Sequence, residues 1–391
     1  MILQRYCTKY LEHWKKQKKW DEKLLLNLIK KHEMPLIKIQ IKNKKVKLLK
    51  DFNAKHRAKR EKALTFLQDI ALLYPQLDIV IYLNLKDTLN REIINTYNIE
   101  GIEIENTKEE LNMKDYHYGV SKSNPELLRM IKTKHINKYK NSYPVFCFEC
   151  DRTMPGILFP TFGADNNDIK NSVNIDPLKF EEKNDDTVFF RGRNLCTDIR
   201  NLDKFEMINL SLTDPEKYDF RMNMGERTLD KLPKKESENN NAGKYVCPTL
   251  VKFCQSQGVL DKNKSYEEIQ DYLVDNFVDF DDIFNHRLLL TVGSAKNRKW
   301  YLSNSCVLEY QFKNKEYFYE EIFTDMESIV YVNKDTIEEK VAKLRENDYE
   351  LAKNITENRK KIFMEYLHYP NLVKWYGDFL LEYQKIKKNK C

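Results

Sequence analysis

The sequence contains no long run of apolar residues. No stretch approaches the ~20 consecutive apolar residues that a membrane-spanning helix needs. The first ten residues, 1–10, also lack the apolar core of a signal peptide. We therefore expect a protein that is soluble and stays in the cytoplasm.

Cysteines are few and show no repeated close spacing. The eight cysteines are scattered, and most lie within apolar runs, which is typical of reduced thiols in a protein core. Cys147 and Cys150 have the spacing of zinc ligands, but they lie in a strand-like segment, 144–151. Alternation along a strand would place the two sulfurs on opposite faces, and no second close pair follows. We therefore predict no metal site.

The chain contains many residues of both charges, with an excess of basic ones. Its 67 Lys and Arg exceed its 60 Asp and Glu, which gives a formal net charge of +7. The excess is spread along the chain, with dense runs at 15–19, 42–47 and 385–390. Such runs are usually solvated faces, and only a clustered stripe would favour nucleic acid, which we do not expect as a partner. An anionic substrate or a peripheral membrane contact is compatible with this charge.

The length and composition favour two packed α/β domains. The chain has 391 residues, of which 41% are hydrophobic and 12% aromatic. Helices that alternate with short apolar strands indicate a parallel sheet. In the first half we predict a helix over 1–33 ended by Pro35, a half-exposed strand over 36–42, a helix from 54 ended by Pro75, a buried strand over 78–85 and a strand near 143.

The second half repeats the alternation after a turn-rich linker at 163–171. Asp335 and Glu338 form a capping box that should open a helix. A stripe of apolar residues over 372–386 predicts a long terminal helix that packs on the first half of the chain. The other predicted features are strands near 187, 288, 304 and 328, helices after 197 and near 249 and 265, and a polar loop over 231–244.

The segment 186–193 joins a short apolar strand to two arginines. Residues 187–190 have the β-branched and aromatic side chains of a buried strand, which is followed by Arg191, Gly192 and Arg193. Guanidinium groups meet phosphate or carboxylate oxygens in a bidentate fork, and glycine lets the backbone approach a ligand closely. The segment therefore suits an anionic ligand.

A second segment, 288–299, has the same arrangement. Its strand leads through Gly293 and Ser294 to a basic helix start that contains Arg298. For either segment alone, the arginines could equally be structural ion-pair partners at strand ends. Two such segments in one chain favour a shared phosphate ligand.

The order of these segments resembles glycosyltransferase family ninety, which holds the protein O-glucosyltransferases and the fungal capsule-associated xylosyltransferases. The resemblance covers the chain from about Phe52 to the C-terminus. Two features depart from it: Gly293 lies one residue closer to Arg298 than in the family pattern, and the lysine-rich first fifty residues match nothing in it. The matching features are Phe-Phe-Arg-Gly at 189–192 with Arg200 and Leu202 following, the Gly-Ser-x-x-x-Arg turn, and the strand 329–332 before an Asp-capped helix.

The resemblance implies a GT-B-like α/β fold, in which two Rossmann-like domains face a central cleft. We expect an acceptor-side domain over 1–165, a nucleotide-sugar domain over 172–365 and a helix over 366–391 that crosses back to the first domain. The implied reaction is the inverting transfer of a sugar from UDP-glucose or UDP-xylose to a hydroxyl of a glycan or protein. GT-B enzymes generally stabilise the leaving diphosphate with side chains and helix dipoles, so no metal cofactor is expected.

Strand ends supply the candidate site residues, because ligands collect at the carboxyl ends of strands in open α/β sheets. The acceptor hydroxyl must lose a proton, which requires a carboxylate as general base. By its match to the family's catalytic aspartate, Asp87 would be this base. Alternatively, Asp87 could cap a helix that begins at Thr88. Asp151 is the rival candidate for the general base. The expected donor-binding residues are Arg191, Gly192, Arg193, Arg200, Gly293, Ser294, Lys296 and Arg298.

Two other functions are compatible with the sequence. Asp279 and Asp281 form an Asp-x-Asp, the signature of metal-dependent GT-A transferases, although their acidic context has the pattern of an amphipathic helix end. A glycan- or nucleic-acid-binding protein that kept the fold without the chemistry is the second alternative. Hydrolysis of the donor separates the two classes, because a binding module would release no UDP.

Overall fold

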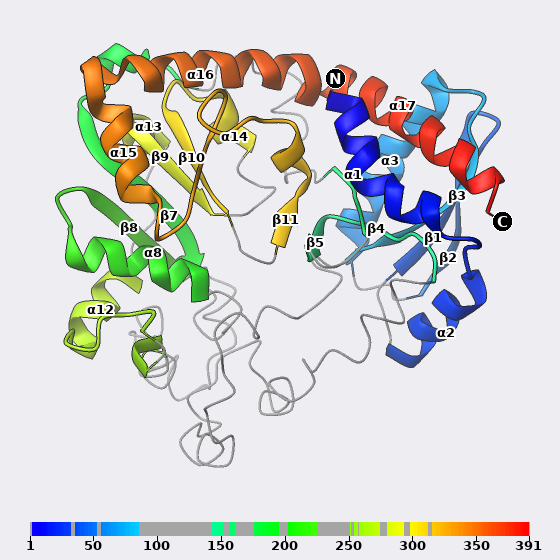
Figure 1. Cartoon of the computed structure of the whole chain (residues 1–391), viewed down its shortest axis with the longest axis horizontal. Helices are drawn as coiled ribbons and strands as arrows, with labels where there is room; N and C mark the ends of the chain where they lie inside the picture. The colour runs from blue at the N-terminus through cyan, green and yellow to red at the C-terminus, as the bar shows by residue number, and fades with distance from the viewer. Residues whose placement is uncertain are drawn as a thin grey trace.

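The chain folds into a mixed α/β structure with two five-stranded sheets (Figure 1). The predicted linker at 163–171 and the polar loop at 231–244 lie outside the part of the chain that the structure describes. This computed structural model describes residues 2–32, 36–52, 56–85, 142–151, 156–160, 176–194, 202–224, 251, 254–256, 258–273, 280–292, 298–311 and 315–390.

The first sheet is mixed, not parallel as predicted. Its strands β1 and β3 occupy the predicted segments, but β1 pairs in an antiparallel manner with both β2 and β3. The reason is a hairpin in the basic run 42–47, where Asn43 and Lys44 take positive φ angles of 51° and 62°. Such angles belong to a tight two-residue hairpin turn. The order is β2-β1-β3-β4-β6, with β1 Leu36–Lys42, β2 Lys45–Asp51, β3 Asp78–Asn84, β4 Phe146–Cys147 and β6 Ile157–Leu158.

The predicted N-terminal helix is two helices, α1 (Ile2–Lys16) and α2 (Glu22–His32). Trp20 is buried between them, and its indole donates to the carbonyl of Trp14 at 3.0 Å. The Asp21 carboxylate then accepts a hydrogen bond from the backbone N–H of Leu24 at 2.8 Å, which starts α2. Trp20 also stacks on the ring of Tyr383, so a tertiary contact and a new cap interrupt a segment that is helical by pattern.

The helix α3 (Arg57–Leu73) confirms the helix predicted from residue 54. Ala63, Phe66, Leu67 and Ile70 are buried as expected. Leu73, which belongs to the same predicted stripe, is 54% exposed. It is the last residue of the helix, whereas Tyr74, which follows it in the same stripe, is buried.

The second sheet is parallel throughout and confirms the predicted α/β alternation. Its order is β12-β10-β9-β7-β8, and each neighbouring pair is parallel. Four strands lie where they were predicted, and β8 was missed. The strands are β7 Asp185–Asn194, β8 Tyr218–Met224, β9 His286–Val292, β10 Cys306–Tyr310 and β12 Val330–Val332.

Helices cover the second sheet. In α15 the predicted apolar side is buried, at Ile337, Val341 and Leu344. The predicted capping box is wrong, because Thr336 precedes the helix and the Asn333 side chain accepts a hydrogen bond from the backbone N–H of Asp335. The helix predicted near 249 is described only at 251 and 254–256. The described helices are α8 Leu202–Thr213, α12 Tyr266–Leu273, α13 Phe280–Phe284, α14 Arg298–Leu302, α15 Ile337–Arg345 and α16 Glu350–Ile362.

The terminal helix α17 (Tyr369–Lys388) packs on α1 and α3, as its apolar stripe predicts. It continues the line of α16 through the one-turn segment Phe363–Leu367 and reaches across to the first sheet (Figure 1). The Tyr376 hydroxyl donates to the carbonyl of Leu158 in β6 at 3.0 Å. None of the described helices combines the length and apolarity needed to cross a membrane.

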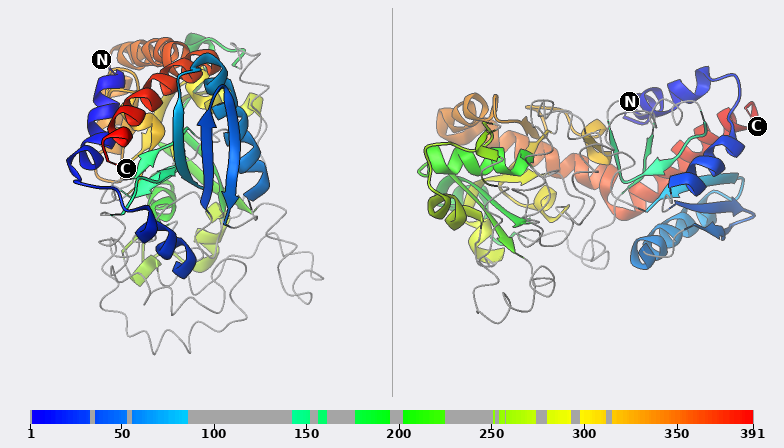
Figure 2. Two further views of the ribbon diagram at one scale, coloured as in Figure 1. Left: turned by 90° about the vertical axis from the view of Figure 1, so that its right-hand side faces the viewer. Right: turned by 90° about the horizontal axis from the view of Figure 1, so that it is seen from below.

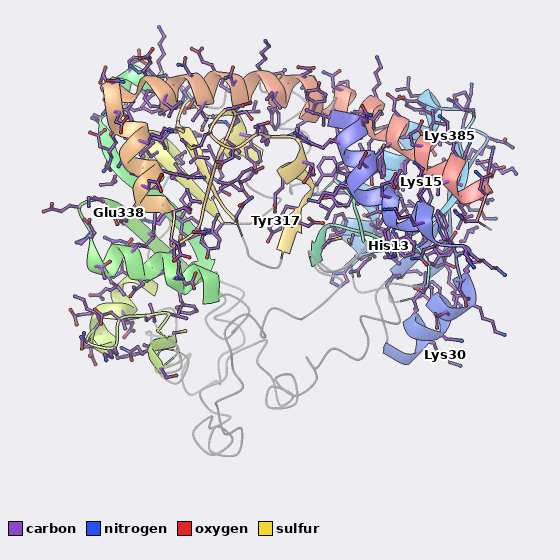
Figure 3. The ribbon with its side chains drawn as sticks, in the orientation of Figure 1. His13, Lys15, Lys30, Tyr317, Glu338 and Lys385 are labelled. Carbon is purple, nitrogen blue, oxygen red and sulfur yellow. The ribbon has the colours of Figure 1, made fainter. Side chains whose placement is uncertain are left out.

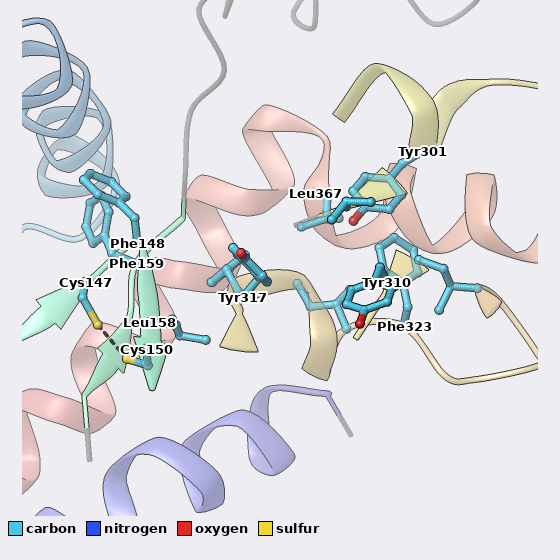
Figure 4. Close-up of a cluster of buried hydrophobic side chains, with 14 of the residues drawn as sticks. Cys147, Phe148, Cys150, Leu158, Phe159, Tyr301, Tyr310, Tyr317, Phe323 and Leu367 are labelled. Carbon is cyan, nitrogen blue, oxygen red and sulfur yellow. Dashed lines mark hydrogen bonds between the residues drawn. The ribbon is translucent and has the colours of Figure 1, made fainter. Parts of the chain in front are cut away.

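A two-stranded sheet and a continuous core also join the two halves. In it, β5 (Glu149–Asp151) pairs with β11 (Lys315–Tyr317) in an antiparallel manner. Figure 4 shows Tyr317 between the side chains around Leu158 and the aromatic group around Tyr310. Most buried apolar side chains of both sheets belong to one cluster, while Phe189 and Leu289 belong to a second cluster with Ile283.

The prediction that the sulfurs of Cys147 and Cys150 lie on opposite faces is wrong. A bend at Phe148 separates β4 from β5, so the segment is not one continuous strand. The two Sγ atoms lie 2.6 Å apart, and both side chains are fully buried (Figure 4). Among the described residues, no three His, Cys, Asp or Glu side chains are grouped as metal ligands would be.

Gly377 of α17 tests the contact between the terminal helix and α3. A Cβ at this position would overlap the ring of Tyr74, and the Tyr74 hydroxyl donates to the carbonyl of Lys374 at 2.6 Å and to Asp378 at 2.8 Å. The ring cannot move away without losing these bonds. We expect Gly377→Ala to lower the free energy of unfolding by about 1 to 3 kcal/mol in denaturant titrations. The exposed Lys374→Ala on the same helix is the control, and an unchanged midpoint for Gly377→Ala would contradict the described contact.

Candidate functional site

The strands of the two arginine-containing segments, β7 and β9, end at the same edge of the second sheet. β7 and β9 are parallel neighbours, with Val188 opposite Leu288 and Phe189 opposite Leu289. Both chains therefore run towards the carboxyl edge, where β7 reaches Gly192 and β9 ends one residue before Gly293. The structure thus brings together two segments that are far apart in sequence, at the edge where parallel sheets usually bind ligands.

Arg191 is held by the neighbouring strand β8. Its guanidinium donates to the carbonyl of Asp219 at 2.9 Å and to the Asp219 carboxylate at 2.8 Å. It also donates to the carbonyl of Phe190 and lies 4.2 Å from the centre of the Phe189 ring. The same carboxylate accepts from Arg221 at 2.9 Å. Arg191 is therefore a structural ion-pair partner, which was the alternative to phosphate binding in the sequence analysis. The ion pair links β7 to β8.

The other predicted site residues are described in part or not at all. Asp87, Arg200, Gly293, Ser294 and Lys296 lie outside the described residues. Gly192 and Arg193 belong to the backbone of β7, where they pair with Met222 and Asn223 of β8. Arg298 is the first residue of α14.

The two candidate general bases are nearest in sequence to strands that belong to different sheets. β3 ends at Asn84, so the chain leads towards Asp87 from the carboxyl edge of the first sheet. Asp151 ends β5, which pairs with β11 and does not belong to the first sheet. Asp281 lies in the backbone of α13, and Asp279 lies outside the described residues.

Glu309 is a buried carboxyl near the same edge that sequence reasoning did not single out. It is the penultimate residue of β10, is 6% exposed, and accepts a hydrogen bond from the Tyr301 hydroxyl at 2.8 Å. Burial raises the pKa of Glu309 to about 8, Glu320 adds to this rise, and the Tyr301 hydrogen bond opposes it. The available signal was a glutamate in the otherwise apolar run Cys306 to Tyr310.

A second buried contact fixes the end of β10. The Tyr310 hydroxyl donates to the Glu206 carboxylate of α8 at 2.8 Å. Side chains from β10 therefore reach α14 on one side and α8 on the other, so the carboxyl edge between β9 and β10 is tied to both helices.

Comparisons with known proteins give little support for a particular family. No protein-family model matches the chain, and no curated protein matches it. Among solved structures, the chain is similar to the C-terminal domain of a glycosyl transferase group 1 family protein (LpcC) from Francisella tularensis, with 15% sequence identity and a TM-score of 0.27. The similarity covers 49% of this chain and 98% of that chain. The resemblance to glycosyltransferase family ninety stays a prediction from the motifs.

The raised pKa of Glu309 predicts a pH-dependent stability. An unfolded glutamate has a pKa near ~4.3, so between that value and about 8 the folded chain holds a proton that the unfolded chain has lost. Stability from this group therefore falls as the pH rises, by about 1.4 kcal/mol per pH unit at most. Glu309→Gln keeps the neutral shape and should become steadily more stable than the wild type between about pH 5 and pH 8.

The measurement is denaturant unfolding of the wild type and Glu309→Gln at a series of pH values. Glu338→Gln, which changes an exposed carboxyl of α15, controls for the loss of a carboxylate as such. Parallel stability profiles for the wild type and Glu309→Gln would show that Glu309 does not hold a proton in the fold.

Proposed function

We propose that this chain is a glycosyltransferase with a GT-B-like fold that transfers glucose or xylose from a UDP-sugar to a hydroxyl of a glycan or protein. The observation that supports this most strongly is the shared carboxyl edge of β7 and β9. Of the two segments that suit a phosphate ligand, Arg191 to Arg193 lie in the last residues of β7, and Gly293 to Arg298 follow the last residue of β9 in sequence. The family resemblance concerns the same two segments.

In this proposal the diphosphate of the donor lies at that edge. As the sugar leaves, negative charge develops on the diphosphate, and fixed cations stabilise it. Arg193, Arg200, Lys296 and Arg298 supply the cations, while Gly192, Gly293 and Ser294 let the backbone approach. Arg191 acts mainly by holding β7 against β8 through Asp219, which fixes the position of the strand end.

The acceptor hydroxyl is activated on the other side of the donor. Its oxygen attacks the anomeric carbon, the bond between that carbon and the diphosphate oxygen breaks, and the hydroxyl proton passes to Asp87. A single displacement of this kind inverts the configuration at the anomeric carbon. The reaction requires no divalent metal in this proposal, so turnover should persist in excess EDTA; loss with EDTA and recovery with manganese would favour the Asp279 and Asp281 alternative.

A substitution of Arg298 tests whether this residue binds the diphosphate of the donor. Loss of one charge-assisted phosphate contact should weaken UDP binding by about 1.5 to 3 kcal/mol, because such bonds are the stronger class of hydrogen bonds. Calorimetric titration of UDP into Arg298→Ala measures this directly. Arg57→Ala, an exposed arginine that pairs with Glu61 on α3, is the matched control and should bind UDP as the wild type does. Equal UDP affinity in Arg298→Ala and the wild type would remove this residue from the site.

A substitution of Asp87 tests whether this residue is the general base. Asp87→Asn keeps the size and hydrogen-bonding reach but removes the proton acceptor, so turnover should fall by roughly 10² to 10⁴ while UDP affinity is retained. If Asp87 only caps a helix, Asp87→Asn should be nearly as active as the wild type, since asparagine caps about as well as aspartate. Release of UDP from the donor is the readout. An active Asp87→Asn with an inactive Asp151→Asn would assign the base to β5, and no UDP release by the wild type would favour a binding protein.

A further inference from the structure

The positive charge of the chain is concentrated in its first 52 residues. This segment contains 15 Lys and Arg and 5 Asp and Glu, a net charge of +10. Because the whole chain carries +7, the remaining 339 residues carry −3. The basic excess is therefore not spread evenly, contrary to the interpretation from the sequence. It belongs to the part of the chain that forms α1, α2, β1 and β2.

The fold adds the other basic end of the chain to this region. α17 packs against α1, and the backbone N–H of Trp20 bonds to the carbonyl of Lys390. The basic end of α17 therefore lies beside α1, with Lys390 next to Trp20. A groove of about 480 Å³ lies along the contact between the two helices. Lys15 and Lys385 are among its lining residues (Figure 3).

A third basic segment, the β1–β2 hairpin, is linked to α17 through β3, which lies on the other side of that helix. The Gln384 side chain accepts from the backbone N–H of Asp78 at 2.5 Å, and Lys387 donates to the carbonyl of Val80 at 2.7 Å. Asp78 in turn lies opposite Lys42, next to the hairpin turn. Figure 2 (left) shows α1, the end of α17 and the strands of the first sheet side by side on one face.

We call this face the terminal basic surface. Glu12, Asp78 and Glu382 also lie on it, and each pairs with a lysine. By contrast, Lys16, Lys18 and Lys19 form no ion pair with any other described residue. The exposed lysines that define the surface are Lys15, Lys16, Lys18, Lys19, Lys42, Lys44, Lys45, Lys385 and Lys388.

The chemistry of this surface differs from that of a nucleic-acid site. The first 52 residues contain 14 lysines and one arginine, whereas nucleic-acid recognition favours arginine, whose planar guanidinium forms bidentate contacts and stacks on rings. Single strands also need aromatic side chains on which bases stack. The tryptophans of this region, Trp14 and Trp20, are buried in the core.

Exposed leucines next to the lysines point to a membrane. Leu49, Leu72 and Leu73 are the large apolar side chains that the described part of the chain exposes most, and all three belong to β2 or α3. α3 lies against the hairpin one turn before Leu72, because the Gln68 side chain donates to the carbonyl of Lys44 at 2.9 Å. Lysines attract anionic lipid headgroups additively, and neighbouring apolar side chains can enter the interface.

We propose that the terminal basic surface docks this protein on a membrane that contains anionic phospholipids. The lysines of three segments face the headgroups, and the exposed leucines of β2 and α3 reach the acyl boundary. The docking is independent of the proposed transferase chemistry.

The test is sedimentation of the full chain with vesicles of phosphatidylcholine alone and of phosphatidylcholine with about a third phosphatidylserine. We expect binding only to the anionic vesicles, and its loss at roughly 1 M salt, where the Debye length is about 3 Å. Each surface lysine should contribute about fivefold. A triple variant, Lys16→Glu, Lys44→Glu and Lys388→Glu, takes one lysine from each segment and should bind at least about 100-fold more weakly.

A second triple variant makes the same change in charge elsewhere. Lys262→Glu, Lys343→Glu and Lys361→Glu change exposed lysines of the other half of the chain, and this variant should keep most of the binding. Leu72→Ser with Leu73→Ser should weaken binding by about tenfold without changing the charge. Unchanged melting temperatures would show that the variants fold.

Three results would overturn the proposal. Equal binding to neutral and anionic vesicles would exclude recognition of lipid charge. An equal loss of binding in the two triple variants would show an effect of net charge alone. Tighter binding to a mixed-sequence DNA duplex than to anionic vesicles at the same salt concentration would make the surface a nucleic-acid site.

Discussion

A group of buried charges holds the starts of three neighbouring parallel strands. Lys183, just before β7, pairs with Asp176 at 2.9 Å and donates to the carbonyl of Phe284, just before β9. Asp176 also accepts from the backbone N–H of Asn304, just before β10. Arg359 of α16, which is fully buried, donates to the carbonyls of Tyr301, Ser303 and Ser305. Burial lowers the pKa of Lys183 and that of Arg359, which falls to about 10, so both cations depend on these partners.

These contacts hold the amino ends of the strands in the second sheet, and further polar contacts hold the carboxyl ends. Because the strands are parallel, aligning their starts also aligns their ends, where the segments around Gly192 and Gly293 emerge. Two polar contacts near those ends, Arg191 with Asp219 and Tyr301 with Glu309, link β7 to β8 and α14 to β10. The ends of β7 and β9 therefore belong to a backbone that is held by polar contacts at both ends of the strands.

The sequence predicted the elements whose signals are local. The strands around Ile39 and Ile81, the helix α3 and the stripe of α17 follow from periodicity, because each has one face against a core. The hairpin at Asn43 was missed because its turn contains no glycine, and the break at Trp20 was missed because it depends on the tertiary contact of Trp20 with Tyr383. The partner of Arg191 could not be found either, since Asp219 lies 28 residues away on a strand that was not predicted.

The apolar stripe of α17 has a consequence beyond stability. In the sequence, the basic runs at 15–19 and 385–390 are separated by most of the chain, and each alone has the pattern of a solvated face. Burial of Trp375, Tyr376 and Phe379 against the first half of the chain brings the second run beside the first. The electrostatic attraction of this surface for anions is therefore a property of the fold. A residue that anchors α17, such as Gly377, supports the terminal basic surface as well as the core.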